Sequence, residues 1–265
     1  MPQGGLLTFL AFFITSILII MNENCVDYNA ESYKAARPSY PSNVIDIIKK
    51  HAPFLNNGRC IEIGAGTGKF TELLITAGVS NLTCIEPNVE MLKFWEINGN
   101  FKILNCSCEN IGIEDECFDY FFFAQSLHWF ANEKSRSEIL RLSGLNSKYF
   151  VLWNELNPLS NSATKDYLYL TSELKMKQKK EIHTLPQRYF INKVFHNRNY
   201  FCYKINHLQS LDYNGMLNRF LSSSLTHGLD KQDLQKALND LSQIFYRNVK
   251  KDVVTLHYNC YLYVL

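Results

Sequence analysis

The chain has 265 residues, of which 46% are hydrophobic and 20% are charged. This composition can bury a sizeable core and excludes a wholly disordered chain. The formal net charge of +2 is too small to indicate a nucleic-acid partner. Eight scattered cysteines, none in a C-x-x-C pair, exclude a disulfide-stapled miniprotein. We therefore expect reduced cysteines, no metal site and a cytoplasmic location.

The apolar N-terminal segment, residues 1–21, is the one feature that departs from a cytoplasmic protein. Residues 4–21 carry no charge. As a helix of about 1.5 Å per residue they would span about 27 Å, just short of a ~30 Å hydrocarbon core. A signal peptide would require a lysine or arginine ahead of them, and none is present. Three alternatives stay open: a membrane anchor that contacts lipid through residues 4–21, an atypical leader, or a non-native extension ahead of Met21.

Strands and helices alternate through the middle of the chain. Residues 22–57 are predicted to form an arm and a first helix at 44–51, and residues 58–154 a core domain. In that core, strands are predicted at 59–63, 82–85, 101–105, 119–123 and 149–153, and helices at 70–77, 87–95 and 131–142. This alternation indicates βαβ units and a parallel sheet that is covered on both faces.

The remainder of the chain loses this alternation. Residues 155–225 are predicted to form a cap over the substrate, in which the lysine-rich stretch 175–180 is a solvated face. Further elements are predicted as a strand at 201–207, a helix at 211–221, a helix at 231–246 and a closing strand at 253–265, the last two within the C-terminal region 226–265. The fold class is predicted to be α/β, a Rossmann-like doubly wound, mostly parallel seven-stranded sheet with a helical cap insertion.

The segment IEIGAGTGKF, residues 61–70, is the sharpest chemical signal. A strand containing Glu62 runs into a turn with three alternate glycines ahead of a helix. Glycine permits a tight turn and lets a ligand lie against the backbone, and the helix N-terminus adds N–H donors. A dinucleotide fingerprint would need glycine at Lys69, and a P-loop would need glycine at Ile63. Neither phosphate-binding motif therefore fits, which also disfavours a nicotinamide-dependent oxidoreductase.

An acidic residue two positions ahead of G-x-G-x-G resembles the first motif of class I S-adenosylmethionine (SAM)-dependent methyltransferases. Three later segments match the family in order: 84–92, 106–110 and 124–130. The resemblance covers about residues 27–265. It implies SAM as the cofactor, held by residues of the arm, the glycine turn and the ends of the following strands: Tyr33, Glu62, Gly64, Ala65, Gly66, Gly68, Glu86, Met91, Cys108, Glu109 and Gln125.

Individual roles follow from the same resemblance. Glu62 is expected to organise the turn and the methionine amino group, and Glu86 to accept both ribose hydroxyls. Met91 is expected to cover the adenine, while Cys108 and Glu109 lie where the family contacts the adenine edge. Gln125 follows the fourth strand, at the mouth of the active site.

Flanking segments narrow the resemblance to the type 11 small-molecule methyltransferases, and within them to the trans-aconitate-methyltransferase-like group. The matching segments are 33–41, 127–130, 152–154 and 222–224. One departure lies at 143–147, where Ser-Gly-Leu-Asn-Ser replaces the family's Lys-Pro-Gly-Gly-like turn. The resemblance predicts methyl transfer to a small-molecule acceptor at oxygen, either a carboxylate or a hydroxyl, with no nucleic-acid partner. The alternative is a catalytically degenerate SAM-binding module with a regulatory or interaction role, associated with a membrane through the N-terminal segment.

Three residues are the candidate catalytic groups: Arg37, His128 and Trp129. Methyl transfer from a sulfonium is an in-line displacement, so alignment and desolvation supply much of the catalysis. A carboxylate acceptor needs no base but needs a cation or donor to orient it, for which Arg37 and His128 are suited. A hydroxyl acceptor needs a base, and His128 is the one suitable residue by type and place.

Overall fold

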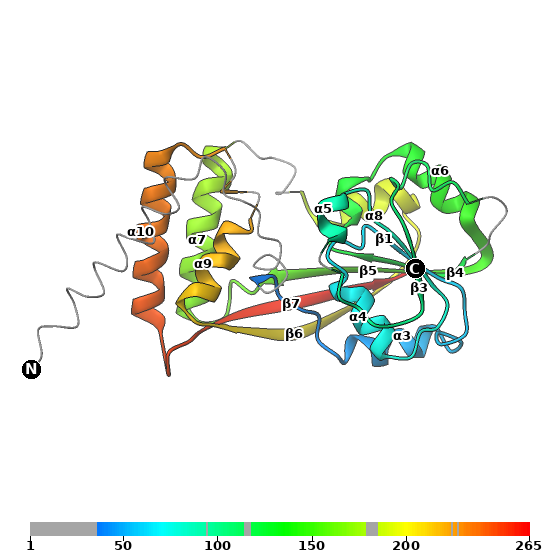
Figure 1. Cartoon of the computed structure of the whole chain (residues 1–265), viewed down its shortest axis with the longest axis horizontal. Coiled ribbons are helices and arrows are strands. Elements are labelled where there is room, and N and C mark those ends of the chain that lie inside the picture. The colour runs from blue at the N-terminus through cyan, green and yellow to red at the C-terminus, as the bar shows by residue number, and fades with distance from the viewer. Residues whose placement is uncertain (1–35, 94, 114–117, 179–184, 224, 227) are drawn as a thin grey trace, which may run out of the picture.

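The structure is a computed structural model that describes residues 36–93, 95–113, 118–178, 185–223, 225–226 and 228–265. Its centre is a seven-stranded sheet with the strand order β3-β2-β1-β4-β5-β7-β6 (Figure 1). The strands are β1 (Cys60–Ile63), β2 (Leu82–Ile85), β3 (Phe101–Leu104), β4 (Phe118–Ala124), β5 (Ser143–Leu156), β6 (Phe201–Leu211) and β7 (Val254–Val264). The first five pair in parallel, and β7 pairs antiparallel with both β5 and β6. The predicted mostly parallel, Rossmann-like sheet is confirmed.

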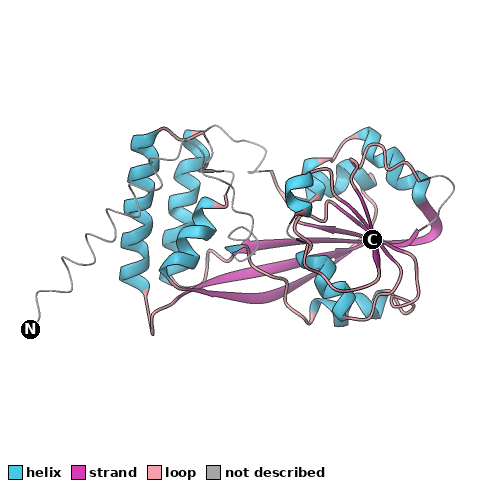
Figure 2. Cartoon of the chain, in the orientation of Figure 1, coloured by secondary structure: helices cyan, strands magenta, loops and turns pink. Residues whose placement is uncertain are grey.

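Helices cover both faces of the parallel strands (Figure 2). The helical elements are α3 (Val44–His51), α4 (Lys69–Thr76), α5 (Val89–Leu92), the 3₁₀ turn η1 (Leu127–Trp129), α6 (Glu133–Leu142), α7 (Ser162–Lys177), α8 (Gln187–Phe195), α9 (Tyr213–Leu221) and α10 (Lys231–Asn248). On one face, α3 and α4 bury Ile48, Phe70 and Leu74 against the sheet. On the other face, α6 and α8 bury Ile139 and Phe190. Strands β1 and β2 are buried along their whole length, as expected for strands with both faces covered.

The cap is a separate layer of three helices, α7, α9 and α10, at one end of the long strands β6 and β7 (Figure 1). Their apolar faces pack around Met216, Phe220 and Leu241, each of which is fully buried. Side-chain caps fix the start of each helix: for example, Asp230 accepts a hydrogen bond from the Asp233 amide at the N-terminus of α10. Two-layer packing of this kind lets the cap close over the carboxyl ends of the parallel strands.

The division of the chain differs from the predicted one in two places. Helix α8 falls within the predicted cap region but packs on the core sheet, because Phe190, Ile191 and Val194 point into that apolar layer. Helix α10 falls outside that region but belongs to the cap. Residues 143–147, where the sequence departs from the family turn, are the start of β5 and pair with β4 through Ser143 and Phe118.

The apolar segment 1–21 lies outside the described residues, as does the rest of the chain up to residue 35. Among the residues that are described, no helix is long and apolar enough to cross a membrane. The six cysteines within the described ranges are all free thiols.

Phe122 tests the account of the core. Its ring is fully buried and stacks on Phe150 at 5.1 Å between centroids, with Phe70 at 5.8 Å. We expect Phe122→Ala to lower the free energy of unfolding by about 3–5 kcal/mol in urea titrations, through lost burial and a residual cavity. The matched control Phe54→Ala, at a side chain that is 74% exposed, is expected to change it by less than about 0.5 kcal/mol. Equal effects of the two changes would contradict this packing.

Candidate active site

The glycine turn after β1 adopts backbone conformations that L side chains rarely take. Gly64, Gly66 and Gly68 have φ of 74°, 59° and 80°. A Cβ on Gly64 would lie 2.5 Å from Ser126 Cβ, and one on Gly68 would lie 2.4 Å from Ile97 Cδ1. A Cβ on Gly66 would meet nothing within 4 Å. The outer two glycines therefore permit close packing, whereas Gly66 faces the open space of the pocket.

Glu86 ties this turn to the neighbouring strand. In the parallel register Ile63 pairs with Ile85, so Gly64 and Glu86 leave the sheet side by side. The Gly66 N–H donates to Glu86 Oε2 at 2.7 Å, and the Asn88 N–H donates to Glu86 Oε1 at 2.9 Å. The indole of Trp95 donates to the Gly66 carbonyl at 2.8 Å, so both backbone groups of Gly66 are held. Trp95 falls in the predicted helix 87–95, of which the structure has only Val89–Leu92 as helix.

The buried carboxylate of Glu86 fits the predicted ribose contact. Each carboxylate oxygen has two lone-pair sites and accepts one backbone bond, so each can accept one further donor. Together with the open space at Gly66, this pair of acceptors suits a ligand with two adjacent hydroxyls that lies flat on the turn. The residues therefore fit the adenosyl and methionyl parts of SAM.

Glu62 is buried beneath the same turn, where its Oε2 accepts a hydrogen bond from the Thr71 hydroxyl at 2.6 Å. Burial raises the pKa of Glu62 to about 8, and the charge of Glu86 adds to this, against the opposing effect of the Thr71 bond. A carboxyl group with this pKa is protonated at neutral pH until a cation approaches it. The methionine ammonium that the sequence resemblance assigns to Glu62 would be such a cation.

The predicted adenine contacts lie along the same pocket. Met91, Cys108 and Glu109 all line it. Burial raises the pKa of the Cys108 thiol to about 12, above the opposing effect of Ser135, so the group stays a neutral thiol. Glu109 accepts a hydrogen bond from the Asn132 amide at 2.8 Å, and Asn132 also caps α6.

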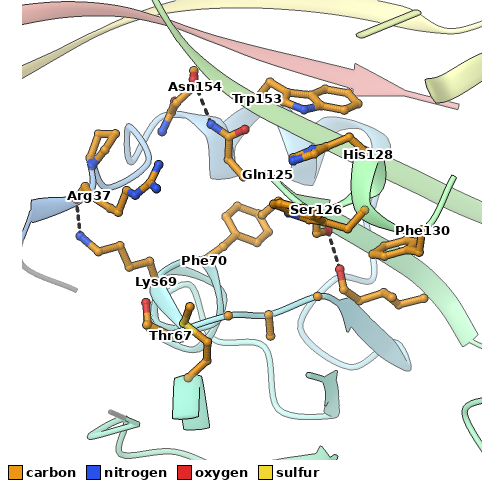
Figure 3. Close-up of a pocket in the computed structure, with 18 of the residues that line it drawn as sticks. Arg37, Thr67, Lys69, Phe70, Gln125, Ser126, His128, Phe130, Trp153 and Asn154 are labelled. Atoms are coloured by element: carbon orange, nitrogen blue, oxygen red, sulfur yellow. Dashed lines mark hydrogen bonds between the residues drawn. The ribbon is translucent and has the colours of Figure 1, made fainter. Parts of the chain in front are cut away.

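The turn after β4 carries a residue with a strained backbone. Gln125 has a φ of 57°, a left-handed conformation that is costly for a residue with a Cβ and is typical of functional sites. Its side-chain amide donates to the Asn154 carbonyl at 2.9 Å, while Ser126 Oγ donates to the Ile63 carbonyl at 2.5 Å (Figure 3). These bonds fix the turn after β4 against both β1 and β5.

His128 and Trp129 follow on the turn η1. The imidazole of His128 lies between two aromatic neighbours, with the Trp129 ring at 4.9 Å and the Phe190 ring at 6.0 Å between centroids. Trp129 is 67% exposed and lies at the rim of the pocket. His128 is therefore the better candidate for proton transfer or hydrogen-bond donation. The position of Trp129 at the rim suits closure of the pocket.

The N-terminal arm brings Arg37 into the pocket. Arg37 Nη2 donates to the Ser222 carbonyl of the cap at 2.7 Å, and Lys69 Nζ donates to the Arg37 carbonyl at 2.5 Å (Figure 3). The arm is therefore bound to both the cap and α4. Tyr33, the other predicted arm residue, lies outside the described residues.

One cavity of about 960 Å³ connects these groups, at the upper end of the range for small-molecule sites. Every predicted site residue within the described ranges lines it, except Gly68. Several further lining residues come from the cap, β5 and β7, and no sequence signal distinguished most of them: Asn154, Tyr167, Thr171, Lys175, Arg219 and Tyr258. The expectation that the stretch 175–180 is a solvated face is wrong for Lys175. Tyr167, Thr171 and Lys175 recur every fourth residue, a helical spacing that could have indicated one shared face.

Comparison with known proteins adds a family to this geometry. Residues 61–144 match the family model described as "Methyltransferase domain". This part of the chain is therefore similar to a methyltransferase domain. An uncharacterised methyltransferase-like protein of Schizosaccharomyces pombe is 36% identical over 125 residues, which cover 46% of this chain and 48% of that protein. An uncharacterised methyltransferase of Mycobacterium bovis is 29% identical over 125 residues, 46% of this chain and 49% of that protein. The chain thus matches about half the length of these curated relatives.

Solved structures share the fold. A candidate type II methyltransferase from Anaeromyxobacter dehalogenans aligns with a TM-score of 0.60 at 14% identity, over 86% of this chain and 97% of that chain. A SAM-dependent methyltransferase from Thiobacillus denitrificans, in complex with S-adenosyl-L-homocysteine, aligns with a TM-score of 0.50 at 11% identity, over 90% of this chain and 98% of that chain. The sheet is thus the Rossmann-like sheet of methyltransferases, and the family match supports SAM as the cofactor.

Gly66 gives a direct test of the cofactor site. Asparagine tolerates the left-handed conformation better than other side chains, so Gly66→Asn places an amide in the open space at modest strain. We expect folding to persist and the affinity for SAM, measured by calorimetry, to fall by at least about tenfold. The control is Gly112→Asn, because Gly112 has a φ of 69°, also meets nothing within 4 Å and lies outside the pocket. Unchanged SAM affinity in Gly66→Asn would remove the turn from the cofactor site.

Glu62 makes stability depend on pH. The pKa of Glu62 is about 8 in the folded protein and near its ordinary value of 4.5 in the unfolded chain. The folded state therefore binds the extra proton between these values, and Glu62 weakens the fold as pH rises through that window. We therefore compare the free energy of unfolding of Glu62→Gln with that of the unsubstituted protein, in urea titrations without SAM. We expect the difference to shift in favour of the variant by a few kcal/mol as pH rises from about 5 to about 8.5. The exposed Glu72→Gln should show a constant offset; the same constant offset in Glu62→Gln would contradict the raised pKa.

Proposed function

We propose that this chain is a SAM-dependent methyltransferase that transfers a methyl group to an oxygen atom of a small-molecule acceptor. The observation that carries the proposal is the single cavity that joins Gly66 and Glu86 at the strand ends to Arg37 and His128 near the cap. One end of the cavity fits the adenosine and methionine parts of SAM, and the rest leaves room for a small acceptor. The relatives' names and the family match support the reaction class.

The cofactor, when bound, supplies an electrophilic methyl group on a positively charged sulfonium. The chain's own residues bind and orient the reactants. Glu86 and the glycine turn would hold the nucleoside, and Gln125, fixed by Asn154, shapes a wall of the pocket. The aromatic side chains of Phe130, Trp153 and Phe190 line the pocket and exclude water there.

The acceptor chemistry decides what Arg37 and His128 do. For a carboxylate acceptor, the guanidinium of Arg37 orients the reacting oxygen and no proton moves. For a hydroxyl acceptor, an imidazole nitrogen of His128 takes the proton as the oxygen attacks. The resemblance of the flanking segments to the trans-aconitate-methyltransferase-like group supports the carboxylate.

One of the two features that favour the degenerate-module alternative lies away from the pocket: residues 143–147 form an irregular start to β5 and line no part of the cavity. The test of activity is a product-mass screen. The protein is incubated with isotopically labelled SAM and a panel of carboxylic acids and alcohols, and products are searched for the labelled methyl group. A labelled ester or ether supports the proposal. Tight SAM binding with no labelled product from the whole panel contradicts it and favours the degenerate module.

His128 tests the reaction itself. If an alcohol in the panel is methylated, we expect His128→Ala to lower turnover by at least about 10²-fold, because a positioned base contributes that much. SAM affinity is expected to stay within about twofold, because we assign the nucleoside to Glu86 and the glycine turn and not to His128. His196→Asn is the control, since His196 is exposed and has a φ of 46° that asparagine tolerates. Unchanged turnover in His128→Ala would remove His128 from the mechanism.

A further inference from the structure

The end of the pocket nearest the cap is built by α7, α9 and β7, and we call these residues the cap-side end. They are Tyr167, Thr171 and Lys175 of α7, Arg219 of α9 and Tyr258 of β7. The SAM-fitting residues come from the strand ends on the other side of the pocket. The cap-side end is therefore the part of the cavity left for the acceptor.

A hydroxyl without a hydrogen bond is buried in the wall of this end. The Tyr167 side chain is 1% exposed, and its OH has no hydrogen-bond partner among the described residues. An unsatisfied buried hydroxyl costs free energy unless a ligand completes it. Burial raises the pKa of Tyr167, and the nearby charges of Arg219 and Arg37 lower it in part, so the group stays a protonated donor at neutral pH.

Arg219 and Arg37 are held by one chain of hydrogen bonds. Arg219 Nε donates to Tyr258 OH at 3.3 Å, and Tyr258 OH donates to Gln209 Oε1 at 3.1 Å. Gln209 Nε2 in turn donates to the carbonyl of Ala36 at 2.9 Å, next to Arg37. The network holds the Arg219 guanidinium and the backbone next to Arg37 in place before any ligand enters, which lowers the entropy cost of binding.

The charges at the cap-side end have one sign. Among the described residues, α7, α9 and β7 contribute Lys175 and Arg219 to the pocket and no carboxylate. Of the carboxylates that line the cavity, Glu62, Glu86 and Glu109 come from β1, from the end of β2 and from the segment after β3, and Glu155 lies on β5, where it pairs with Asn259 next to Tyr258. A donor hydroxyl among cations recognises an anion, whose oxygens accept from both.

We infer that the cap-side end binds an oxyanion group of the acceptor, held by the Tyr167 hydroxyl and the Arg219 guanidinium, with Lys175 and Arg37 adding positive charge. This inference rests on the proposed function, since it assigns the acceptor's end of the same pocket. Arg219 and Tyr167 then select acceptors that carry a carboxylate or a phosphate over their neutral analogues.

The test measures binding to the protein saturated with S-adenosylhomocysteine. Titration calorimetry compares succinate, methyl phosphate and the neutral succinamide at millimolar concentration. We expect at least one anion to bind and succinamide not to bind, and the stronger of the two anions identifies the oxyanion. We expect Arg219→Gln and Tyr167→Phe each to weaken that anion by about tenfold, since each removes a donor to a charged group, while Arg219→Lys keeps most of the affinity.

Matched controls use the same helical cap. Tyr169→Phe lies on the exposed face of α7, and Arg247→Gln lies on α10 with a side chain that is 66% exposed. Both are expected to leave anion affinity unchanged. Tyr167→Phe is also expected to raise the urea midpoint of the ligand-free protein, since it removes the unsatisfied hydroxyl.

Each remaining outcome overturns the inference. No binding of either anion would do so, as would equal binding of succinamide or unchanged anion affinity in both variants. Loss of S-adenosylhomocysteine binding in the unsubstituted protein would instead overturn the proposed function, so the two failures are distinct.

Discussion

The hydrogen bond from the Gly66 amide to the Glu86 carboxylate joins the turns that leave β1 and β2, and the rest of the site depends on it. Parallel pairing brings the two strand ends together, but it does not orient the turns. The buried Glu86 does so by accepting from both Gly66 and Asn88. A carboxylate removed from water needs such donors, and its remaining lone pairs can accept bonds from a ligand.

The second constraint is the closure of the cap and arm over those strand ends. Three hydrogen bonds hold the arm. The Ser222 carbonyl accepts from Arg37, the Gln209 amide donates to the Ala36 carbonyl, and Asn154 Nδ2 donates to the Ser39 carbonyl at 3.1 Å. Segments far apart in the sequence thereby line one half-open cavity, and electrostatic interactions are stronger there than in water wherever its walls exclude solvent. A reaction that depends on alignment and desolvation needs this enclosure more than it needs reactive side chains.

The sequence predicts where the glycine turn and Glu86 lie because the signals for them are local. The glycine turn and Glu86 each follow a short apolar strand directly, and helix 44–51 was predicted with the ends that the structure has. The acceptor half depends on tertiary packing. Lys175 and Lys177 belong to one lysine-rich stretch, yet Lys175 lines the pocket and Lys177 pairs with Asp233 of α10. Only the packing of α7 on α10 decides which lysine turns inward. Likewise, α8 packs on the core sheet through Phe190. Its sequence alone would suit a cap helix equally well.

The most direct measurement of the central claim is a crystal structure of the protein with S-adenosylhomocysteine. We expect the ribose hydroxyls to lie at Glu86 and the amino-acid part to lie against Gly64–Gly66. The sulfur should face the part of the cavity near His128. An empty cavity at saturating ligand, or the nucleoside bound away from the turn between β1 and α4, would contradict the account and leave only the shared fold.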